Sequence, residues 1–248
     1  SPLDAGALLR IGPAPLSVAW ACPARGVWST GVGVAAEEEA DVQWENGVPA
    51  GMPGPWFGGW TYSGAERWVL PKVLAWWHGG KTYGAVFGAP LLAAISEAEP
   101  SSATSCDVQP GDRTGWAARV ERALAEIAAG RLSKVVLARR IEATGVFDER
   151  KVLKALEARY PACRTFLIRD GGDAFLGASP ETLVSVKGRV LETEALAGTG
   201  KDEALLSSAK DLREHGLVID AIVEALTPLC TSVEVAPAPE LKRLANVV

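Results

Sequence analysis

The feature that most restricts the fold of this chain is a change in its hydrophobic pattern near residue 113. Before it, short apolar runs such as PLSVAWA, WVLPKVLAWW and TYGAVFG are separated by glycine and proline, as is typical of short β-strands. After it, TGWAARVERALAEIAAG repeats its apolar residues at helical spacing, and Gly130 stands where that helix would end. The two patterns together predict an α+β fold with antiparallel pairing.

Tryptophan is also distributed unevenly, which suggests where the chain divides. Eight of the nine tryptophans lie before residue 78, and residues 97–113 are polar and rich in turn formers. We therefore predict a Trp-rich, β-rich subdomain with its connector over residues 1–113, and a second domain over residues 114–248. Within the first part, the Gly79-Gly80 step between two apolar runs predicts a hairpin.

The second part of the chain reads as alternating helices and strands. SKVVLARRIEA, residues 133–143, predicts a strand, and Asp148 is placed to cap a helix whose inward residues are Val152, Leu153 and Leu156. A long helix is expected at roughly residues 202–227. Antiparallel hairpins are predicted between these helices, from TFLIRD, AFLGASPE, TLVSV and RVLETEALAG.

Composition and charge exclude several classes of protein. The formal net charge is −5, with no block of Lys and Arg, which argues against a nucleic-acid partner. No apolar run reaches the roughly 20 residues that a membrane-spanning helix needs, and the first residues do not resemble a secretory signal. The four cysteines form no CxxC pair and there are only two histidines, so zinc and His-based metal clusters are not expected. We expect a cytoplasmic protein that binds neither nucleic acid nor membrane.

Lys134 is the first candidate for chemistry, because it opens the apolar run VVLA. In a strand, Lys134 would share one face with Val136 and Ala138. One interpretation is a lysine at a strand end that keeps its ammonium group in water. The other is a desolvated lysine aimed into a cavity, whose free amine can act as a base.

Glu181 and the pair Gly198-Thr199 are ambiguous in the same way. Glu181 follows a break made by Gly177 and Pro180 in FLGASPE, so its carboxyl is either solvated or a general acid in apolar surroundings. Gly198 and Thr199 close TEALAGT, which is either an ordinary turn or a place where backbone N–H groups and a hydroxyl hold an anion. The residues alone leave both alternatives open.

Two acids on the expected long helix suggest a cation site. Glu214, Val218 and Ile222 fall in one i, i+4, i+8 row, and Asp211 lies one turn earlier on nearly the same face. Two carboxylates on a half-buried face favour a hard cation such as Mg²⁺. The alternative is a surface pair of Lys210 with Glu214, although that order of charges is the weaker one.

The order of these segments is more specific than any one of them. SKVVLAR, FLGASPE, TEALAGT and KDLREH resemble the motifs of the chorismate-utilising enzyme family, and within it isochorismate synthase. The likeness extends over residues 115–248, with a looser likeness earlier. It implies a fold of antiparallel sheets flanked by helices. Members of the family run on beyond the last residue here, so the resemblance implies a chain incomplete at the C-terminus, lacking roughly the C-terminal third.

The resemblance also implies roles for individual residues. Lys134 matches the base that activates water for attack at C2 of chorismate, and Glu181 matches the acid that protonates the departing C4 hydroxyl. Ala197, Gly198 and Thr199 match the segment that lines the substrate site. This implies an isomerase that converts chorismate to isochorismate.

The resemblance further implies Mg²⁺ as the cofactor. Glu214 matches a ligand of the ion, and Asp211 is a second acid beside it. The ion would bind the substrate carboxylate.

Residues at these site positions also distinguish the enzymes of the family from one another. Ala197 stands where aminodeoxychorismate synthases often carry a nucleophilic lysine, and anthranilate synthases usually carry glutamine where this chain has Lys134. Isochorismate synthase is thus favoured, with salicylate synthase and a non-catalytic chorismate-binding fragment as alternatives. Menaquinone and siderophore biosynthesis are both open as pathways, with a lean towards the first. The sequence does not fix the oligomeric state, and a monomer is compatible with it.

Overall fold

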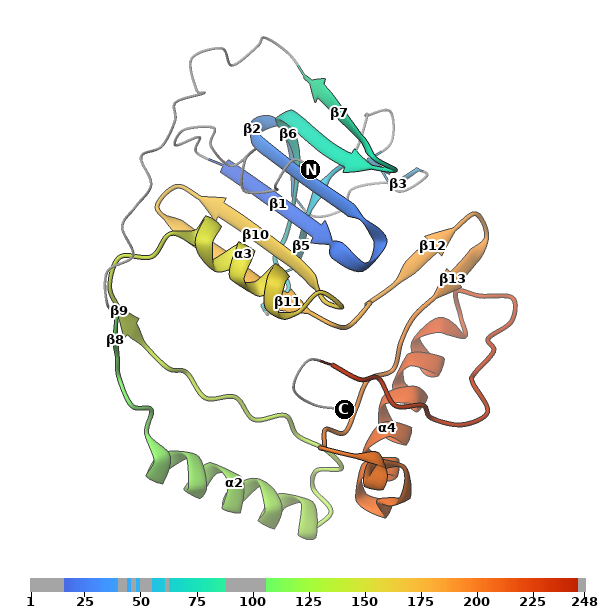
Figure 1. Ribbon diagram of the computed structural model, residues 1–248. Coiled ribbons are helices and arrows are strands. Elements are labelled where there is room, and N and C mark those ends of the chain that lie inside the picture. Colours follow the sequence, from blue (N-terminus) through green and yellow to red (C-terminus); the bar gives the residue numbers. More distant parts are fainter. Residues whose placement is uncertain are drawn as a thin grey trace. The chain divides into compact units, whose positions relative to one another are not determined.

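The computed structural model describes residues 16–39, 44–45, 48–49, 55–60, 63–87 and 106–244. These residues form two compact units that interleave along the sequence (Figure 1). The first unit combines Ser1–Pro100 with Glu149–Glu192, and the second combines Ser101–Asp148 with Thr193–Val248. Each unit is thus made of two separate stretches of sequence, and the boundary predicted at residue 113 stays a prediction.

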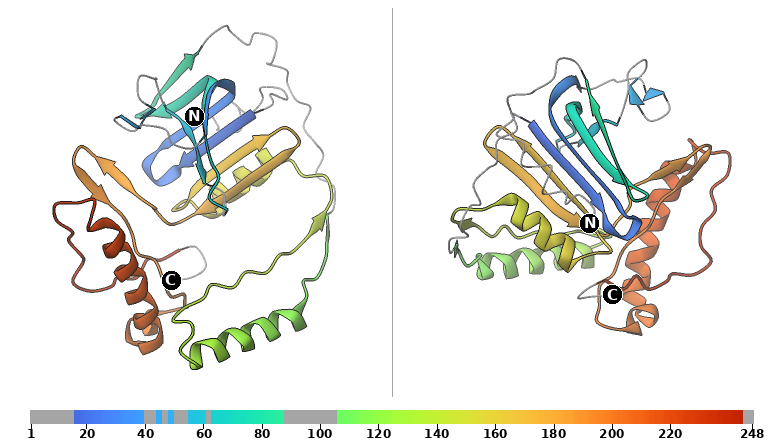
Figure 2. Two further views of the ribbon diagram at one scale, coloured as in Figure 1. Left: turned by 180° about the vertical axis from the view of Figure 1, so that it is seen from behind. Right: turned by 45° about the horizontal axis from the view of Figure 1, so that its top comes forward.

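The first unit is built on a seven-stranded antiparallel sheet with the order β11-β10-β1-β2-β6-β5, in which β7 also pairs with β6. Figure 2 shows the twist of its long strands. The strands of this sheet are β1 (Leu16–Cys22), β2 (Val27–Glu39), β5 (Phe57–Trp60), β6 (Glu66–His78), β7 (Lys81–Val86), β10 (Arg164–Asp170) and β11 (Asp173–Ser179). The unit also contains the two-stranded pairs β3 (Trp44–Glu45) with β4 (Val48–Pro49) and β12 (Ser185–Lys187) with β13 (Val190–Glu192), and the short 3-10 helix η1 (Pro23–Arg25).

Strand β1 is the centre of this unit because both of its faces are covered. It pairs with β2 along one edge and with β10 along the other, where Leu16 lies opposite Asp170. On one face Val18 packs with Val69, and on the other Ala19 packs with Leu167. This explains why LSVAWAC is apolar almost throughout rather than alternating, as expected of a strand buried on two sides.

Helix α3 (Glu149–Arg159) covers part of the same sheet (Figure 1). Leu153 is buried between it and the strands, in the cluster with Ala19 and Leu167. The helix begins directly after Asp148, as predicted. Of the residues expected to face inward, Leu153 does so, whereas the prediction for Val152 is wrong because that side chain is exposed.

Two glycine pairs make the hairpins that the sequence predicts. Gly79 and Gly80 both adopt positive φ and connect β6 to β7, as a type I′ turn requires. Gly171 and Gly172 connect β10 to β11 between the paired Asp170 and Asp173. Local turn chemistry thus determined both connections.

The second unit contains helices and extended segments. Helix α2 (Arg113–Ala128) begins at Asp112, whose carboxylate accepts a hydrogen bond of 2.8 Å from the Gly115 N–H. Helix α4 (Ala209–Leu226) follows a short 3-10 helix, η2 (Glu203–Ser207). Strands β8 (Asp107–Val108) and β9 (Ala143–Thr144) pair over two residues each.

Three expectations about local structure are wrong, two within this unit and one where the chain enters it after β13. The strand predicted over residues 133–143 is paired only at its end, in β9, because no described strand lies beside the rest of it. The helix expected from residue 202 begins as α4 at Ala209, since Ser208 caps it there. The strand expected over RVLETEALAG ends at Glu192, and residues 193–200 continue without regular structure.

The described fold is α+β, with antiparallel sheets and helices, as the sequence predicted. In the described part of the chain, no helix has the length and apolar character needed to cross a membrane.

Candidate functional site

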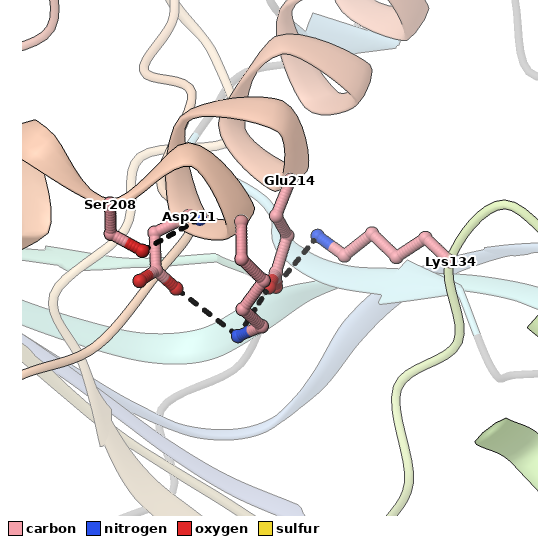
Figure 3. A network of polar contacts seen from close by, with 5 residues as sticks. Lys134, Ser208, Asp211 and Glu214 are labelled. Atoms are coloured by element: carbon pink, nitrogen blue, oxygen red, sulfur yellow. Dashed lines mark hydrogen bonds and ion pairs between the residues drawn. The ribbon is translucent and has the colours of Figure 1, made fainter.

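The first two turns of α4 position the two acids of the expected cation site. The hydroxyl of Ser208 accepts a hydrogen bond of 3.3 Å from the Asp211 N–H, which caps the helix and fixes where Asp211 lies. Hydrogen bonding by Ser208, and after it by Lys210, lowers the pKa of the Asp211 carboxyl. Glu214 follows one turn later, so both carboxylates lie on nearly the same face of α4 (Figure 3).

Lys134 reaches this helix from a segment 80 positions earlier in the sequence. Its Nζ lies 3.4 Å from Oε1 of Glu214, and the two side chains are 27% and 29% exposed. Figure 3 shows the lysine directed at the carboxylate of Glu214. The structure therefore joins the residue expected to act as a base to the residue expected to bind the cation. The ammonium group is neither buried nor fully in water.

Lys210 bridges the same two acids. Its Nζ lies 3.1 Å from Oδ1 of Asp211 and 3.3 Å from Oε2 of Glu214. These hydrogen bonds, first to Asp211 and then to Glu214, raise the pKa of Lys210. The surface pair of Lys210 with Glu214, which the sequence offered as the alternative to a cation site, is thus present in the structure.

The segment TEALAGT lies against the start of α4. Gly198 has a φ of +79°, and a Cβ built on it would lie 3.5 Å from Cβ of Asp211. The ring Nε2 of His215 and the carbonyl oxygen of Ala195 are 3.0 Å apart and form a hydrogen bond. A second contact with this segment is the ion pair of Lys242 Nζ with Glu194 Oε2, at 2.7 Å.

His215 and Lys210 were not singled out as contributors to the site by the sequence, although both belong to KDLREH. The signal for His215 was its position directly after Glu214. An i, i+1 neighbour on a helix points to a different side, and here that side faces Ala195. The position of His215 could therefore have indicated a second contact surface on α4. This surface contacts the segment that contains Ala195, whereas the first carries the acids.

The structure brings together some of the predicted site residues. Lys134, Gly198, Asp211 and Glu214 meet in the second unit, with Ala197 and Thr199 flanking Gly198 in the chain. Glu181 belongs to the first unit, where it follows β11 and is exposed. Its backbone N–H donates a hydrogen bond of 3.4 Å to Oγ of Ser179.

Asp211 and Glu214 supply donors of the kind that Mg²⁺ takes, since its usual ligands are carboxylate oxygens, water and substrate oxygens. Among residues 106–244 and the other described stretches, no three His, Cys, Asp or Glu side chains converge on one point. The donor set therefore fits an ion held by one or two carboxylates that keeps most of its ligands from water or substrate.

Comparison with known proteins indicates the same family as the order of the motifs. Residues 91–248 match the family described as chorismate binding enzyme. The chain is 39% identical over 160 residues to the salicylate biosynthesis isochorismate synthase of Pseudomonas aeruginosa, covering 60% of this chain and 34% of that protein. It is 31% identical over 198 residues to isochorismate synthase DhbC of Bacillus subtilis, covering 71% of this chain and 47% of that protein.

Among solved structures, MenF, the menaquinone-specific isochorismate synthase from Escherichia coli, matches with a TM-score of 0.73 and 20% sequence identity. The match covers 100% of this chain and 66% of that structure. Because the family match spans more than half of the sequence, this chain belongs to the chorismate binding enzyme family. It spans between about a third and a half of the length of the two curated relatives above.

Proposed function

We propose that this protein acts as an isochorismate synthase, which converts chorismate to isochorismate with the help of Mg²⁺. The observation that carries the proposal is the contact of Lys134 Nζ with Glu214 Oε1 at 3.4 Å. A base and a carboxylate for the cation must lie close together if both act on one small substrate. Membership of the chorismate binding enzyme family supports chorismate as that substrate.

In the proposed reaction the amine of Lys134 takes a proton from water as the water oxygen bonds to C2 of chorismate. The ring double bonds shift towards C4 as the C4–oxygen bond breaks. Glu181 protonates the departing hydroxyl, which leaves as water. Lys134 thus gains a proton from the attacking water, Glu181 gives one to the departing hydroxyl, and proton exchange with solvent resets both groups. One water is consumed and one is released, so the overall reaction is an isomerisation.

The remaining site residues bind and orient. Asp211 and Glu214 are the groups that would hold Mg²⁺, which supplies positive charge for a carboxylate of the substrate. Ala197, Gly198 and Thr199 are proposed to line the substrate site. The proposal is supported by the nearness of TEALAGT to the acids, since a Cβ built on Gly198 would lie 3.5 Å from Cβ of Asp211. A location in the cytoplasm stays a prediction from the sequence.

The reaction is tested by incubating the full gene product with chorismate and Mg²⁺, beside a sample that contains EDTA, and separating the products by chromatography. A metal-dependent isochorismate peak is expected. Salicylate as the end product would instead favour salicylate synthase, which forms isochorismate and then eliminates pyruvate. Chorismate binding without any turnover would favour a non-catalytic role and contradict the proposal.

The role of Lys134 is tested by Lys134→Ala. We expect turnover to fall by about 10²- to 10⁴-fold, the usual contribution of a positioned general base. The melting temperature should change little, because one partly exposed ion pair contributes little to stability. Lys187→Ala is the control, since Lys187 is an exposed lysine on β12 in the other unit. Turnover near that of the wild type in Lys134→Ala would contradict the assignment.

A further inference from the structure

Lys210 occupies the space between two carboxylates that are proposed to hold a cation. One ammonium group contacts Oδ1 of Asp211 at 3.1 Å and Oε2 of Glu214 at 3.3 Å. Lys134 takes the other oxygen of Glu214, at 3.4 Å. Both oxygens of Glu214 and one of Asp211 are therefore already paired with positive charge.

The charges of this cluster cancel. With both lysines protonated, as before the chemical step, two carboxylates face two ammonium groups, so an approaching divalent cation meets a cluster with no net negative charge. To bind Glu214 at the positions that these two contacts occupy, the ion must replace an ammonium group. Direct coordination is thus a competition between the ion and a lysine of the protein itself.

The two lysines differ in how easily they can leave. The side chain of Lys134 is 27% exposed, whereas that of Lys210 is 80% exposed. A long, exposed lysine can return its ammonium group to water by rotating its stem, and the exposed pairs that it gives up are weak. Lys210 is therefore the group that an ion can displace at the smaller cost.

We propose that Lys210 is a built-in competitor of the divalent cation, and that it sets the affinity of the Asp211–Glu214 site for Mg²⁺. This rests on the proposed function, in which these two carboxylates hold the ion. While the site is without an ion, Lys210 keeps the two acids from repelling each other; when the ion binds, the ammonium group moves into water. Removing the charge of Lys210 leaves the cluster with a net negative charge, so the ion binds more tightly.

The test is titration calorimetry of the full gene product with MgCl₂, without substrate, for the wild type, Lys210→Met and Lys210→Arg. We expect the Kd for Mg²⁺ to fall by about three- to tenfold in Lys210→Met, the range that one nearby unit charge gives in a water-like medium with salt. Lys210→Arg keeps the charge and should remain close to the wild type.

Lys187→Met is the matched control for a loss of one positive charge, because Lys187 is exposed on β12 in the other unit. Its Kd should stay within about twofold of the wild type, because Lys187 forms neither of the ion pairs that join Lys210 to Asp211 and Glu214. Thermal unfolding of each variant without Mg²⁺ verifies that the protein is folded.

The outcomes separate this inference from the function on which it rests. If Mg²⁺ binds to the wild type and Lys210→Met binds it no more tightly, the competitor role of Lys210 is wrong and the metal site stands. If neither protein binds Mg²⁺, and Glu214→Gln behaves as they do, both the competitor role and the proposed metal site are wrong.

Discussion

The two units of this protein differ in how they are held together. Every residue classed as buried among the described ones belongs to the first unit, from Leu16 in β1 to Leu167 in β10. In the second unit, every described residue is at least partly exposed to solvent. Val136, in the middle of the predicted strand, is 82% exposed. The first unit thus has an apolar core, whereas the described part of the second unit has none of its own.

Charged and capping contacts take the place of a core in the second unit. Lys134 pairs with Glu214, Arg243 pairs with Glu203 at 2.9 Å, and Asp112 and Ser208 cap the two helices. Such contacts orient side chains and helix ends, but each contributes little free energy of folding when it is exposed. We infer that substitutions in the first unit act mainly on stability, and that substitutions in the second act mainly on the geometry of the site.

The largest contrast is expected in amide hydrogen exchange. Amides of β1 and β10 are bonded within the sheet and open only when the core does. Between residues 134 and 141, no backbone amide donates to another backbone carbonyl in the described part of the chain. We expect the latter to exchange faster by at least about a thousandfold. Equal protection in both regions, measured by mass spectrometry, would contradict the contrast.

The second largest effect is expected from Leu167→Ala, on the free energy of unfolding. Leu167 is 1% exposed and packs against Ala19 and Leu153. Its truncation should lower the free energy of unfolding by about 2–5 kcal/mol, through lost burial and the cavity left behind. Leu229→Ala, at an exposed position of the second unit, is the matched control and should change it by less than about 0.5 kcal/mol. Urea unfolding measures both, and similar losses would show that the second unit also depends on apolar packing.

A smaller effect is expected from two adjacent glycines of β5. A Cβ at Gly58 would lie 2.2 Å from the carbonyl oxygen of Arg67, so Gly58→Ala forces β5 away from β6. We expect a loss of about 1–3 kcal/mol, as for other overpacked positions. A Cβ at Gly59 would meet no atom within 4 Å, which makes Gly59→Ala the control. If both variants unfold at the same urea concentration, the close approach of the two strands is not a source of specificity.

The smallest effect should come from the ion pair at the end of α2. Arg131 donates to both oxygens of Glu126, and this lowers the pKa of the Glu126 carboxyl. A carboxyl whose pKa is lower in the folded state stabilises above its unfolded pKa, of about 4.3, and loses that contribution as the pH falls through the folded value. Glu126→Gln should therefore be slightly less stable than the wild type at pH 7, and the difference should vanish once the pH falls below the pKa of the folded carboxyl. A difference that persists at the lower pH would mean that packing, not charge, is lost.

Local features of the fold followed from the sequence because their causes are local. Gly79-Gly80 predicted its hairpin through the positive φ that both residues adopt. The apolar spacing that ends at Gly130 located α2 to within a few residues. The row from Asp211 to Glu214 placed both acids on one face of α4, and the order of four motifs indicated the family to which the chain belongs.

The failures occurred where the outcome depends on partners far along the chain. Residues 134–142 have the composition of a strand, but a strand needs a neighbour to accept its hydrogen bonds, and none of the described segments provides one. Leu124 lies on the apolar stripe of α2 and is nevertheless exposed, because the stripe says which face is apolar and not what covers it.

The sequence by itself determined the long helices approximately, the glycine hairpins, the start of α3 after Asp148 and the motifs that identify the family, because these depend on residues a few positions apart. The tertiary structure alone decided that β1 pairs with β10, that Lys134 contacts Glu214, and that Lys210 bridges two acids of the proposed metal site. Contacts between distant segments depend on the packing of the whole unit. No short window of sequence contains that information.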